Sequence, residues 1–426
     1  MAAHLDREHF IPLRVSDLTD FLATGRGAKT DPRPLSSEGQ ASLRQLADGL
    51  VDHYHRGFNA RLRHIKDAYA PFDPDADTLP LTQPTDEERD RALERLFREV
   101  KGLLEKANYK ELSRLEALEV MKGASYWGVE LDVDWTVFDH LEMYYRGDST
   151  GTRSLRRWWK LWWKEEVTVA EFNRLVIILK QRPHRRLGAV ADTKSVFVKV
   201  FKDLPKCDLE MVLPGTKILL TKLDLGMIVY PLASGFGILL YKVLADVIGF
   251  RDFLSLGLSV TLSWSLAALF LGYGYKSYVS YTTKKTSYAL QLTQSLYYQV
   301  IGTNAGVFAR LVDEAEEQEV REALLAYFFL WQRGGGRAMT ARELDDRIEE
   351  DLDQRLGIKV DFEIADALDK LDTLGLVRRE GEGYKAVSIT EALAILGGSA
   401  KPSVEGKPKA GPQPERWELL DRLAGR

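Results

Sequence analysis

The chain has 426 residues, of which 45% are hydrophobic and 29% charged, and its formal net charge is -4. This length is enough for two or three domains, and the composition indicates that most of the chain folds in water. The slightly acidic balance argues against a general nucleic-acid-binding protein, which normally has a basic excess. A single cysteine, Cys207, excludes an internal disulfide and is typical of a reducing compartment.

Residues 1–127 are predicted to form a helical N-terminal region. Charged residues occur throughout the first twenty positions, so we expect neither a signal peptide nor a mitochondrial presequence there. Ser16 is the predicted N-cap of a short first helix. Apolar residues then recur at helical spacing over residues 37–70 and again over about 86–120, which predicts two long amphipathic helices.

The loop between these two helices contains Asp73, Asp75 and Asp77 at the spacing that begins a calcium-binding loop. Such a loop needs Gly at its sixth position and Glu at its twelfth, where this chain has Thr78 and Pro84. We therefore predict a connecting loop in which aspartates cap and prolines end the helices.

No catalytic or metal-binding motif is recognised in the sequence. His53, His55 and His64 lie on different faces or three turns apart in the first long helix, so they cannot easily share one ion. The run LPGTKILLTK lacks the spacing of a phosphate-binding loop, and no Gly-x-Ser-x-Gly segment is present. We therefore predict no catalytic residue, no metal and no cofactor.

Residues 128–222 are predicted to form a small antiparallel β-sheet followed by a connector. The β-branched or aromatic runs VELDVDW, MYYRG, RLVIILKQR and SVFVKVF are separated by turn residues. A further run, RRWWKLWWK, places Trp158, Trp159, Trp162 and Trp163 among cations. Tryptophan and cations together suit a membrane interface. The alternative is a strand that packs one face into the sheet.

Two uncharged stretches, Leu225–Tyr241 and Phe253–Tyr275, predict a two-helix transmembrane hairpin within residues 223–276. A bilayer crossing needs about 20 apolar residues, which the second stretch provides and the first, diluted by glycine and proline, nearly provides. Basic residues lie on the outer flanks of both stretches, so both chain ends are expected in the cytoplasm. A buried helical hairpin in a soluble core is the alternative.

Small residues recur at every fourth position in both stretches, and this spacing lets helices approach closely. We predict that they form a packing face, between the two spans or across a homo-oligomer, although ordinary small-residue usage is the alternative. They are Ala233, Gly237, Ser255, Ser259, Ser263 and Ala267. Further predicted membrane-interface residues are Lys276, Lys284 and Lys285.

The rest of the chain is predicted to form an amphipathic helix over residues 277–310, a winged-helix-like domain over 311–397, and a disordered tail with a short terminal helix over 398–426. The third helix of the winged-helix-like domain, Phe362–Leu374, has one base, Lys370, among four acids. DNA phosphates would be repelled by that face. A protein contact, or packing on the N-terminal domain, is therefore predicted instead.

Several motifs together resemble a poorly characterised family of two-span membrane proteins, the transmembrane protein one-four-three-like family. The motifs are HFIP, YAPFDPDADT, YYRG, VFVKVFKDLPKCDLEMVLPGTKILLTKLD and LYYQVIGTNAGVFARLVDEAEEQEVREALLAYFFL, in that order over about residues 10–395. The family-motif residues singled out are Phe201, Pro205, Asp208, Leu209, Glu210 and Pro214. The resemblance implies two membrane spans and no established activity. Without a presequence, the chain resembles a bacterial member.

The predicted fold class is an α+β membrane protein with a helical and antiparallel-sheet N-terminal cytoplasmic domain, a transmembrane hairpin and a winged-helix-like C-terminal domain. The predicted function is a non-enzymatic membrane-anchored scaffold or protein-interaction module in the plasma membrane, or in a mitochondrial membrane if the chain is organellar. The alternative is a subunit of an oligomeric channel or transport-associated complex. The predicted partners are the lipid bilayer and a second protein or a second copy of the chain, with no nucleic acid and no small-molecule ligand.

Overall fold

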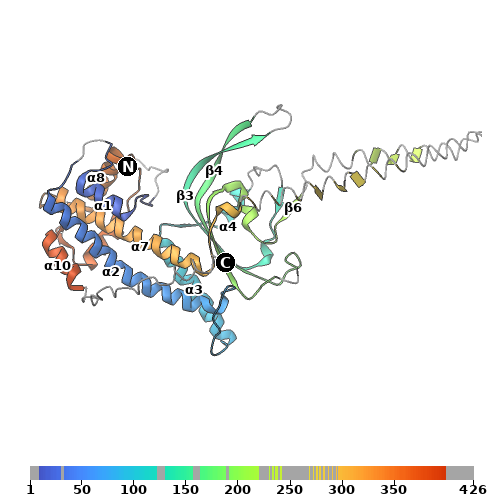
Figure 1. Ribbon diagram of the computed structural model, residues 1–426, viewed down its shortest axis with the longest axis horizontal. Coiled ribbons are helices and arrows are strands. Elements are labelled where there is room, and N and C mark those ends of the chain that lie inside the picture. The colour runs from blue at the N-terminus through green and yellow to red at the C-terminus, as the bar shows by residue number, and fades with distance from the viewer. Residues whose placement is uncertain are drawn as a thin grey trace, which may run out of the picture. The chain divides into compact units, whose positions relative to one another are not determined.

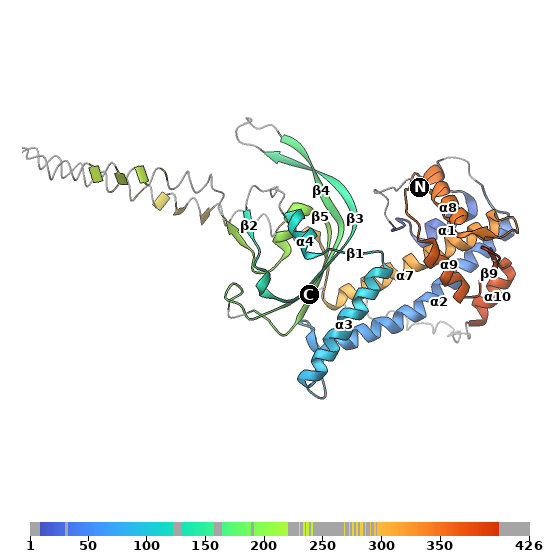
Figure 2. The ribbon, with the colours of Figure 1, turned by 180° about the vertical axis from the view of Figure 1, so that it is seen from behind.

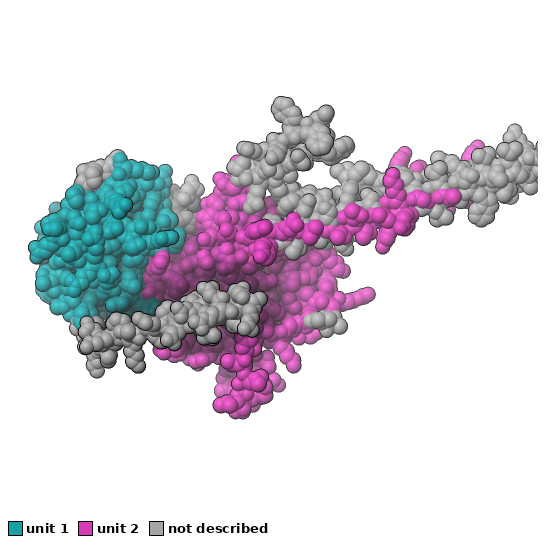
Figure 3. Space-filling model, in the orientation of Figure 1, with its two compact units in different colours: residues 1–57, 319–426 teal, residues 58–318 magenta. Residues whose placement is uncertain are grey.

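The structure is a computed structural model that describes residues 9–29, 33–121, 130–156, 164–188, 191–219 and 296–399, with isolated residues between 230 and 294. The chain divides into two compact units (Figures 1 and 3). Unit 1 comprises residues 1–57 and 319–426, and unit 2 comprises residues 58–318. Both units combine helices with antiparallel strands.

Unit 1 consists of helices from both ends of the chain and a small sheet. Its elements are α1 (Val15–Thr24), the first part of α2 (Ser37–Tyr69), the last part of α7 (Ala305–Phe328), the π-helix η5 (Phe329–Arg333), β8 (Met339–Thr340), α8 (Ala341–Leu356), α9 (Ile364–Thr373), β9 (Val377–Glu380), β10 (Gly383–Ala386) and α10 (Ile389–Ser399). The strands pair antiparallel in the order β8-β10-β9. From α7 to β10, the order of helix, strand, two helices and hairpin is that of a winged helix.

Local sequence explains the bounds of helices such as α8. Thr340 caps its first turn in a reciprocal capping box with the glutamate three residues on. Leu344, Ile348 and Leu352 then recur every fourth residue and are fully buried, which gives the helix one apolar face. Gly357 ends the helix with a left-handed φ of 72°.

Both ends of the chain contribute to the apolar core of unit 1. Leu22 of α1 and Leu46 of α2 lie in the same buried cluster as Leu324, Leu344 and Leu371. The winged-helix-like elements therefore pack directly on the N-terminal helices. The apolar faces of the N-terminal helices and of the winged-helix-like elements are therefore buried only when both segments are present.

Unit 2 is built around a five-stranded antiparallel sheet with the strand order β1-β3-β4-β5-β7, and it also has a two-stranded ribbon, β2-β6. Its elements are the last part of α2, η1 (Ala70–Phe72), α3 (Asp86–Lys106), β1 (Lys110–Glu111), α4 (Arg114–Met121), β2 (Glu130–Asp132), η2 (Trp135–Val137), β3 (Phe138–Arg156), β4 (Lys164–Gln181), β5 (Val196–Pro205), η4 (Lys206–Val212), β6 (Lys217–Leu219), β7 (Val300–Thr303) and the first part of α7. Figure 2 shows these strands from behind.

One row of the sheet departs from regular strand geometry in three neighbouring strands. Gly147, Asn173 and Asp203 occupy one row of β3, β4 and β5, at a position that the registers of both strand pairs skip. Gly147 and Asp203 have positive φ angles of 76° and 48°. Successive side chains of a strand normally point to opposite faces of the sheet. Phe172 and Leu175 are three residues apart, yet both lie in one apolar cluster, so the alternation changes at this row. We call this row the crease.

The prediction of a two-span membrane protein is corrected by the structure. Among the helices of the described ranges, none is both long and apolar enough to cross a bilayer. Length alone is not sufficient, since α2 has 33 residues but carries charged side chains along its whole length. Most residues of Leu225–Tyr241 and of Phe253–Tyr275 lie outside the described residues. The predicted transmembrane hairpin, and the plasma or mitochondrial membrane location with it, are therefore withdrawn.

Two predicted helices also end differently from expectation. The helix over residues 277–310 does not continue to its predicted end, because Val300–Thr303 form β7 and pair with β5. Three of these four residues are β-branched and suit a strand that has a free edge to join. The helix over about 86–120 stops at Lys106, since Asn108 adopts a left-handed φ of 57° and the chain then enters β1.

Candidate interaction site

The loop over residues 73–85 is held at its base by contacts with distant parts of unit 2. Asp73 Oδ1 accepts the Asp75 N–H at 3.0 Å, which makes a local turn. Asp75 Oδ2 accepts a hydrogen bond from Asn304 Nδ2 at 2.6 Å. Asn304 in turn donates its N–H to the Val198 carbonyl at 2.7 Å and accepts the Val198 N–H on Oδ1 at 3.3 Å. Segments from YAPFDPDADT, VFVKVF and IGTNAG therefore meet at one point.

A second contact fixes the helix that leads into this loop. The Tyr69 hydroxyl donates to the Val196 carbonyl at 2.8 Å, and its ring packs edge-on against Phe308 with centroids 4.9 Å apart. Burial, reinforced by Asp73 and Asp75, raises the pKa of Tyr69, so the hydroxyl remains a donor at neutral pH. The N-terminal end of the loop is thus rigidly placed.

The tip of the same loop exposes two leucines. Leu79 is 93% exposed and Leu81 is 106% exposed, with Pro80 between them. The loop then ends at the capping box of α3, where Thr85 accepts from the Glu88 N–H and the Glu88 carboxylate accepts from the Thr85 N–H. The Leu-Pro-Leu tip is therefore an apolar segment held between two ordered ends.

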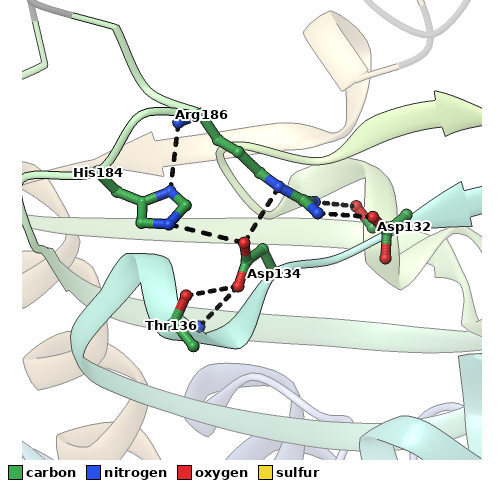
Figure 4. Close-up of polar contacts among 5 residues, drawn as sticks. All are labelled: Asp132, Asp134, Thr136, His184 and Arg186. Atoms are coloured by element: carbon green, nitrogen blue, oxygen red, sulfur yellow. Dashed lines mark hydrogen bonds and ion pairs between the residues drawn. The ribbon is translucent and has the colours of Figure 1, made fainter.

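A polar cluster lies between the ribbon β2-β6 and the segment after β4 (Figure 4). Arg186 contacts Asp132 Oδ2 at 2.8 Å and Asp134 Oδ2 at 3.1 Å. Asp134 also accepts two hydrogen bonds from Thr136, and these bonds, followed by Arg186 and His184, lower its pKa. His184 Nδ1 accepts the Arg186 N–H at 3.2 Å. The contacts in this cluster fix the position of Arg186 and of the strand end.

Glu210, one of the family-motif residues, belongs to the neighbourhood of this cluster. Burial first, and then the Asp132 carboxylate, raises the pKa of Glu210 to about 7. In the described part of the chain no group of three or more His, Cys, Asp or Glu residues could hold a metal ion. The ion pairs of Arg186 with Asp132 and Asp134 hold the ribbon β2-β6 to the segment after β4.

The raised pKa of Glu210 predicts a pH effect on stability. The folded state favours the protonated form of Glu210. Its contribution to the free energy of unfolding is therefore full below the unfolded pKa of 4.5 and is lost as pH rises toward about 7. Glu210 is half-buried, so after solvent screening we expect a loss of only about 1 kcal/mol. Calorimetry should show that Glu210→Gln gains thermal stability relative to wild type between pH 5 and 8. The exposed Glu94→Gln should not, and equal pH slopes for both variants would contradict this assignment.

Unit 2 also contains a buried ion pair on α7. Glu314 accepts from Arg146 Nη2 at 3.0 Å, from the Tyr109 hydroxyl at 2.9 Å and from Arg310 Nε at 3.0 Å. The Arg146 guanidinium lies over the Tyr109 ring, 4.6 Å from its centroid. Arg146 also donates to the Ala107 carbonyl at the end of α3. This cluster joins β3, α3 and α7.

Unit 1 contains a second buried cluster, centred on Lys370 of α9. Its Nζ lies 2.6 Å from Glu322 Oε2, 2.8 Å from Glu319 Oε2 and 2.5 Å from Asp366 Oδ2. Burial alone would lower the pKa of Lys370, but Glu322 and Glu319, with Asp366, raise it above the ordinary value. Its stabilising contribution is therefore complete at all pH values below about 10.5. The charged residues that are exposed on α9, namely Asp366, Asp369 and Asp372, are all acids.

The structure places the predicted site residues as follows. Ala233, Gly237 and Lys276 are exposed helical residues. Ser255, Ser259, Ser263, Ala267, Trp158, Trp159, Trp162, Trp163, Lys284 and Lys285 lie outside the described residues. The family-motif residues lie on β5, η4 and the turn that follows, with Phe201, Pro205, Asp208 and Leu209 buried and Glu210 and Pro214 half-buried. Sequence reasoning missed Leu79, Leu81 and Asn304, although a Leu-Pro-Leu segment within a polar loop was a usable signal.

Comparison with known families finds similarity over part of the chain. A family model described as a protein of unknown function (DUF3754) matches residues 172–306. The matched segment includes the inner half of β4, all of β5 and η4, and β7 with Asn304. Comparison with solved structures finds no match.

Proposed function

We propose that the protein is a protein-interaction scaffold that binds a partner through the Leu79–Leu81 tip of the loop over residues 73–85. The observation that supports this most strongly is the near-complete exposure of both leucines at a tip whose two ends are ordered. Exposed apolar groups gathered in one place are typical of interaction sites. Burying two leucine side chains contributes about 3–6 kcal/mol before the costs of association.

The loop also indicates the chemistry of the partner. Pro80 restricts its own φ and favours an extended Leu79, and in an extended segment residues two apart lie on the same side. Acids flank the tip, at Asp77 on one side and Asp86–Glu88 on the other. A matching partner therefore has two neighbouring apolar pockets and a basic rim, whose charge would speed association.

A crosslinking experiment with the full chain tests this proposal. A photoreactive residue at Gln83 captures the partner, and a peptide of residues 72–86 should displace it. The same peptide with both leucines changed to alanine should not. In the full chain, Leu79→Ala with Leu81→Ala should weaken binding of the captured protein by about tenfold or more.

Leu115 provides the matched control for this experiment. It is a 76% exposed leucine on α4, outside the loop, so Leu115→Ala should leave binding unchanged. Two results would overturn the proposal. The partner could still be captured by the chain with both loop substitutions, or the peptide with alanines could displace the partner as well as the unchanged peptide does. High salt should weaken capture, because the acidic flanks are exposed.

A further inference from the structure

Asn304 lies between β7 and α7, and its side chain contacts two other parts of unit 2. Its N–H donates to the Val198 carbonyl at 2.7 Å and its Oδ1 accepts the Val198 N–H at 3.3 Å, so the side chain continues the pairing of β5 one position beyond β7. Its Nδ2 donates to Asp75 Oδ2 at 2.6 Å, and the residue is 8% exposed. We call these contacts of Asn304 with Val198 and Asp75 the Asn304 bridge.

Strand β7 is a short strand at the end of the sheet order. It comprises Val300–Thr303, none of its residues is buried, and its register with β5 is irregular beside Val200. Backbone hydrogen bonds with little apolar burial around them open more often than those of a core strand. Asn304 follows β7 directly, so an opening that moves β7 away from β5 also moves Asn304 away from Val198 and Asp75.

We propose that the Asn304 bridge makes partner binding at the Leu79–Leu81 tip depend on the pairing of β7 with β5, with Asn304 as a positioning residue. This inference rests on the proposed function of the tip. While the bridge is closed, the loop over residues 73–85 is ordered before the partner arrives, so less conformational entropy is lost on binding. By linkage, a partner bound at the tip must in turn stabilise the pairing of β7.

The other contacts near the loop act on its neighbours. Tyr69 fixes the helix before the loop, and the capping box of Thr85 fixes the start of the helix after it. The Asn304 bridge instead holds a residue of the loop itself, Asp75, and ties it to strand β5. Loss of the bridge should therefore free the loop while both helices stay in place.

An exchange of amide and carboxylate in the full chain tests the bridge. Asn304→Asp keeps the left-handed φ of 48°, which aspartate tolerates, and keeps an acceptor for the Val198 N–H. It replaces only the donor toward Asp75, with a carboxylate that repels it. Adding Asp75→Asn restores a donor on the loop side and the net charge of the wild type. Asp75→Asn alone is the matched control, because its amide oxygen still accepts from Asn304.

Hydrogen exchange reads the bridge without a partner. In Asn304→Asp, amides of residues 73–78 and of Val300–Thr303 should exchange about fivefold faster, because a hydrogen bond of this kind contributes about 1 kcal/mol. The control and the double variant should exchange like wild type. Equal exchange in all four proteins, or fast exchange that the double variant does not reverse, would overturn the inference.

Partner binding separates the bridge from the tip. The peptide of residues 72–86 contains the tip but not Asn304, so its affinity for the protein captured at Gln83 is the reference for an unconstrained tip. The wild-type chain should bind about tenfold more tightly than the peptide, Asn304→Asp should bind like the peptide, and the double variant should bind like wild type.

Two failures can be told apart in this comparison. A wild-type chain that binds no better than the peptide, or an Asn304→Asp chain that binds like wild type, contradicts the role of the bridge and leaves the tip as the binding site. Binding that survives Leu79→Ala with Leu81→Ala removes the tip as the binding site, and the inference with it.

Discussion

Replacing Lys370 with methionine is expected to destabilise unit 1 by about 3–5 kcal/mol. Lys370 is the cation that the structure places between Glu319 and Glu322, whose side chains are only 2% and 3% exposed. Methionine keeps the length of the side chain but removes the charge. The substitution therefore leaves buried carboxylates without their main compensating charge, which costs more than the net stability of the intact pair.

Hydrogen exchange can locate this effect, because unit 2 serves as an internal reference. Amides of α8 and α9 should exchange much faster in Lys370→Met, while those of β3 and β4 should not change. Adding Glu319→Gln and Glu322→Gln should recover much of the loss, since neutral amides need no cation. Lys101→Met is the control, because Lys101 pairs with Glu111 at the surface and should change stability by less than about 1 kcal/mol. A similar loss of stability in Lys370→Met and Lys101→Met would contradict the role of Lys370 as the compensating charge of the two buried carboxylates.

Replacing Gly147 with valine at the crease is expected to destabilise unit 2 by about 3 kcal/mol. A non-glycine residue at the φ of 76° costs about 1–2 kcal/mol by itself. The added Cβ would also meet Asn173, with its Cβ at 2.8 Å, and overpacking costs about 1–3 kcal/mol. Strands β3 and β4 both pass through this row, so their pairing should weaken first.

Gly188 separates the two contributions. It has nearly the same φ, 77°, but no atom lies within 4 Å of a Cβ placed there. Gly188→Val should therefore cost only the backbone contribution, about 1–2 kcal/mol. Urea unfolding followed by hydrogen exchange of β3 and β4 peptides measures both variants. If the two valine substitutions cost the same, the close approach of Gly147 to Asn173 has no energetic importance.

Local patterns predicted those parts of the fold that depend on neighbouring residues. The helix expected over residues 37–70 is observed as Ser37–Tyr69, because its apolar residues recur with the helical period. The run MYYRG falls within β3, and the runs RLVIILKQR and SVFVKVF coincide with parts of β4 and β5 except for one terminal residue each. Periodicity failed where a strand depends on a distant partner. Val300–Thr303 reads as part of a helix in sequence and becomes β7 only because the edge of β5 is available.

In the candidate site too, features that depend on neighbouring residues could be predicted, and contacts between distant residues could not. Aspartates and prolines between two helices indicated a loop, which is observed. The expected capping by aspartate is not, because the bond from the Asp75 N–H to Asp73 is a turn within the loop and the helix that follows is capped by Thr85. No local signal indicated that Asp75 would meet Asn304, which lies 229 positions further along the chain. The Leu-Pro-Leu segment within a polar loop was a local signal for exposed leucines, but only the structure established the near-complete exposure of Leu79 and Leu81.

By itself, the sequence determined the periodicities, the turn residues and the charge of each segment, because these depend on a few adjacent side chains. It therefore located long helices and strand runs and indicated that α9 is an acidic helix. Only the tertiary structure decided that both ends of the chain share the core of unit 1 and that Lys370, the one base of α9, is buried among carboxylates. It also decided that the crease aligns Gly147 with Asn173 and Asp203. These features require segments far apart in the chain to meet, and burial and pairing between such segments are properties of the assembled fold.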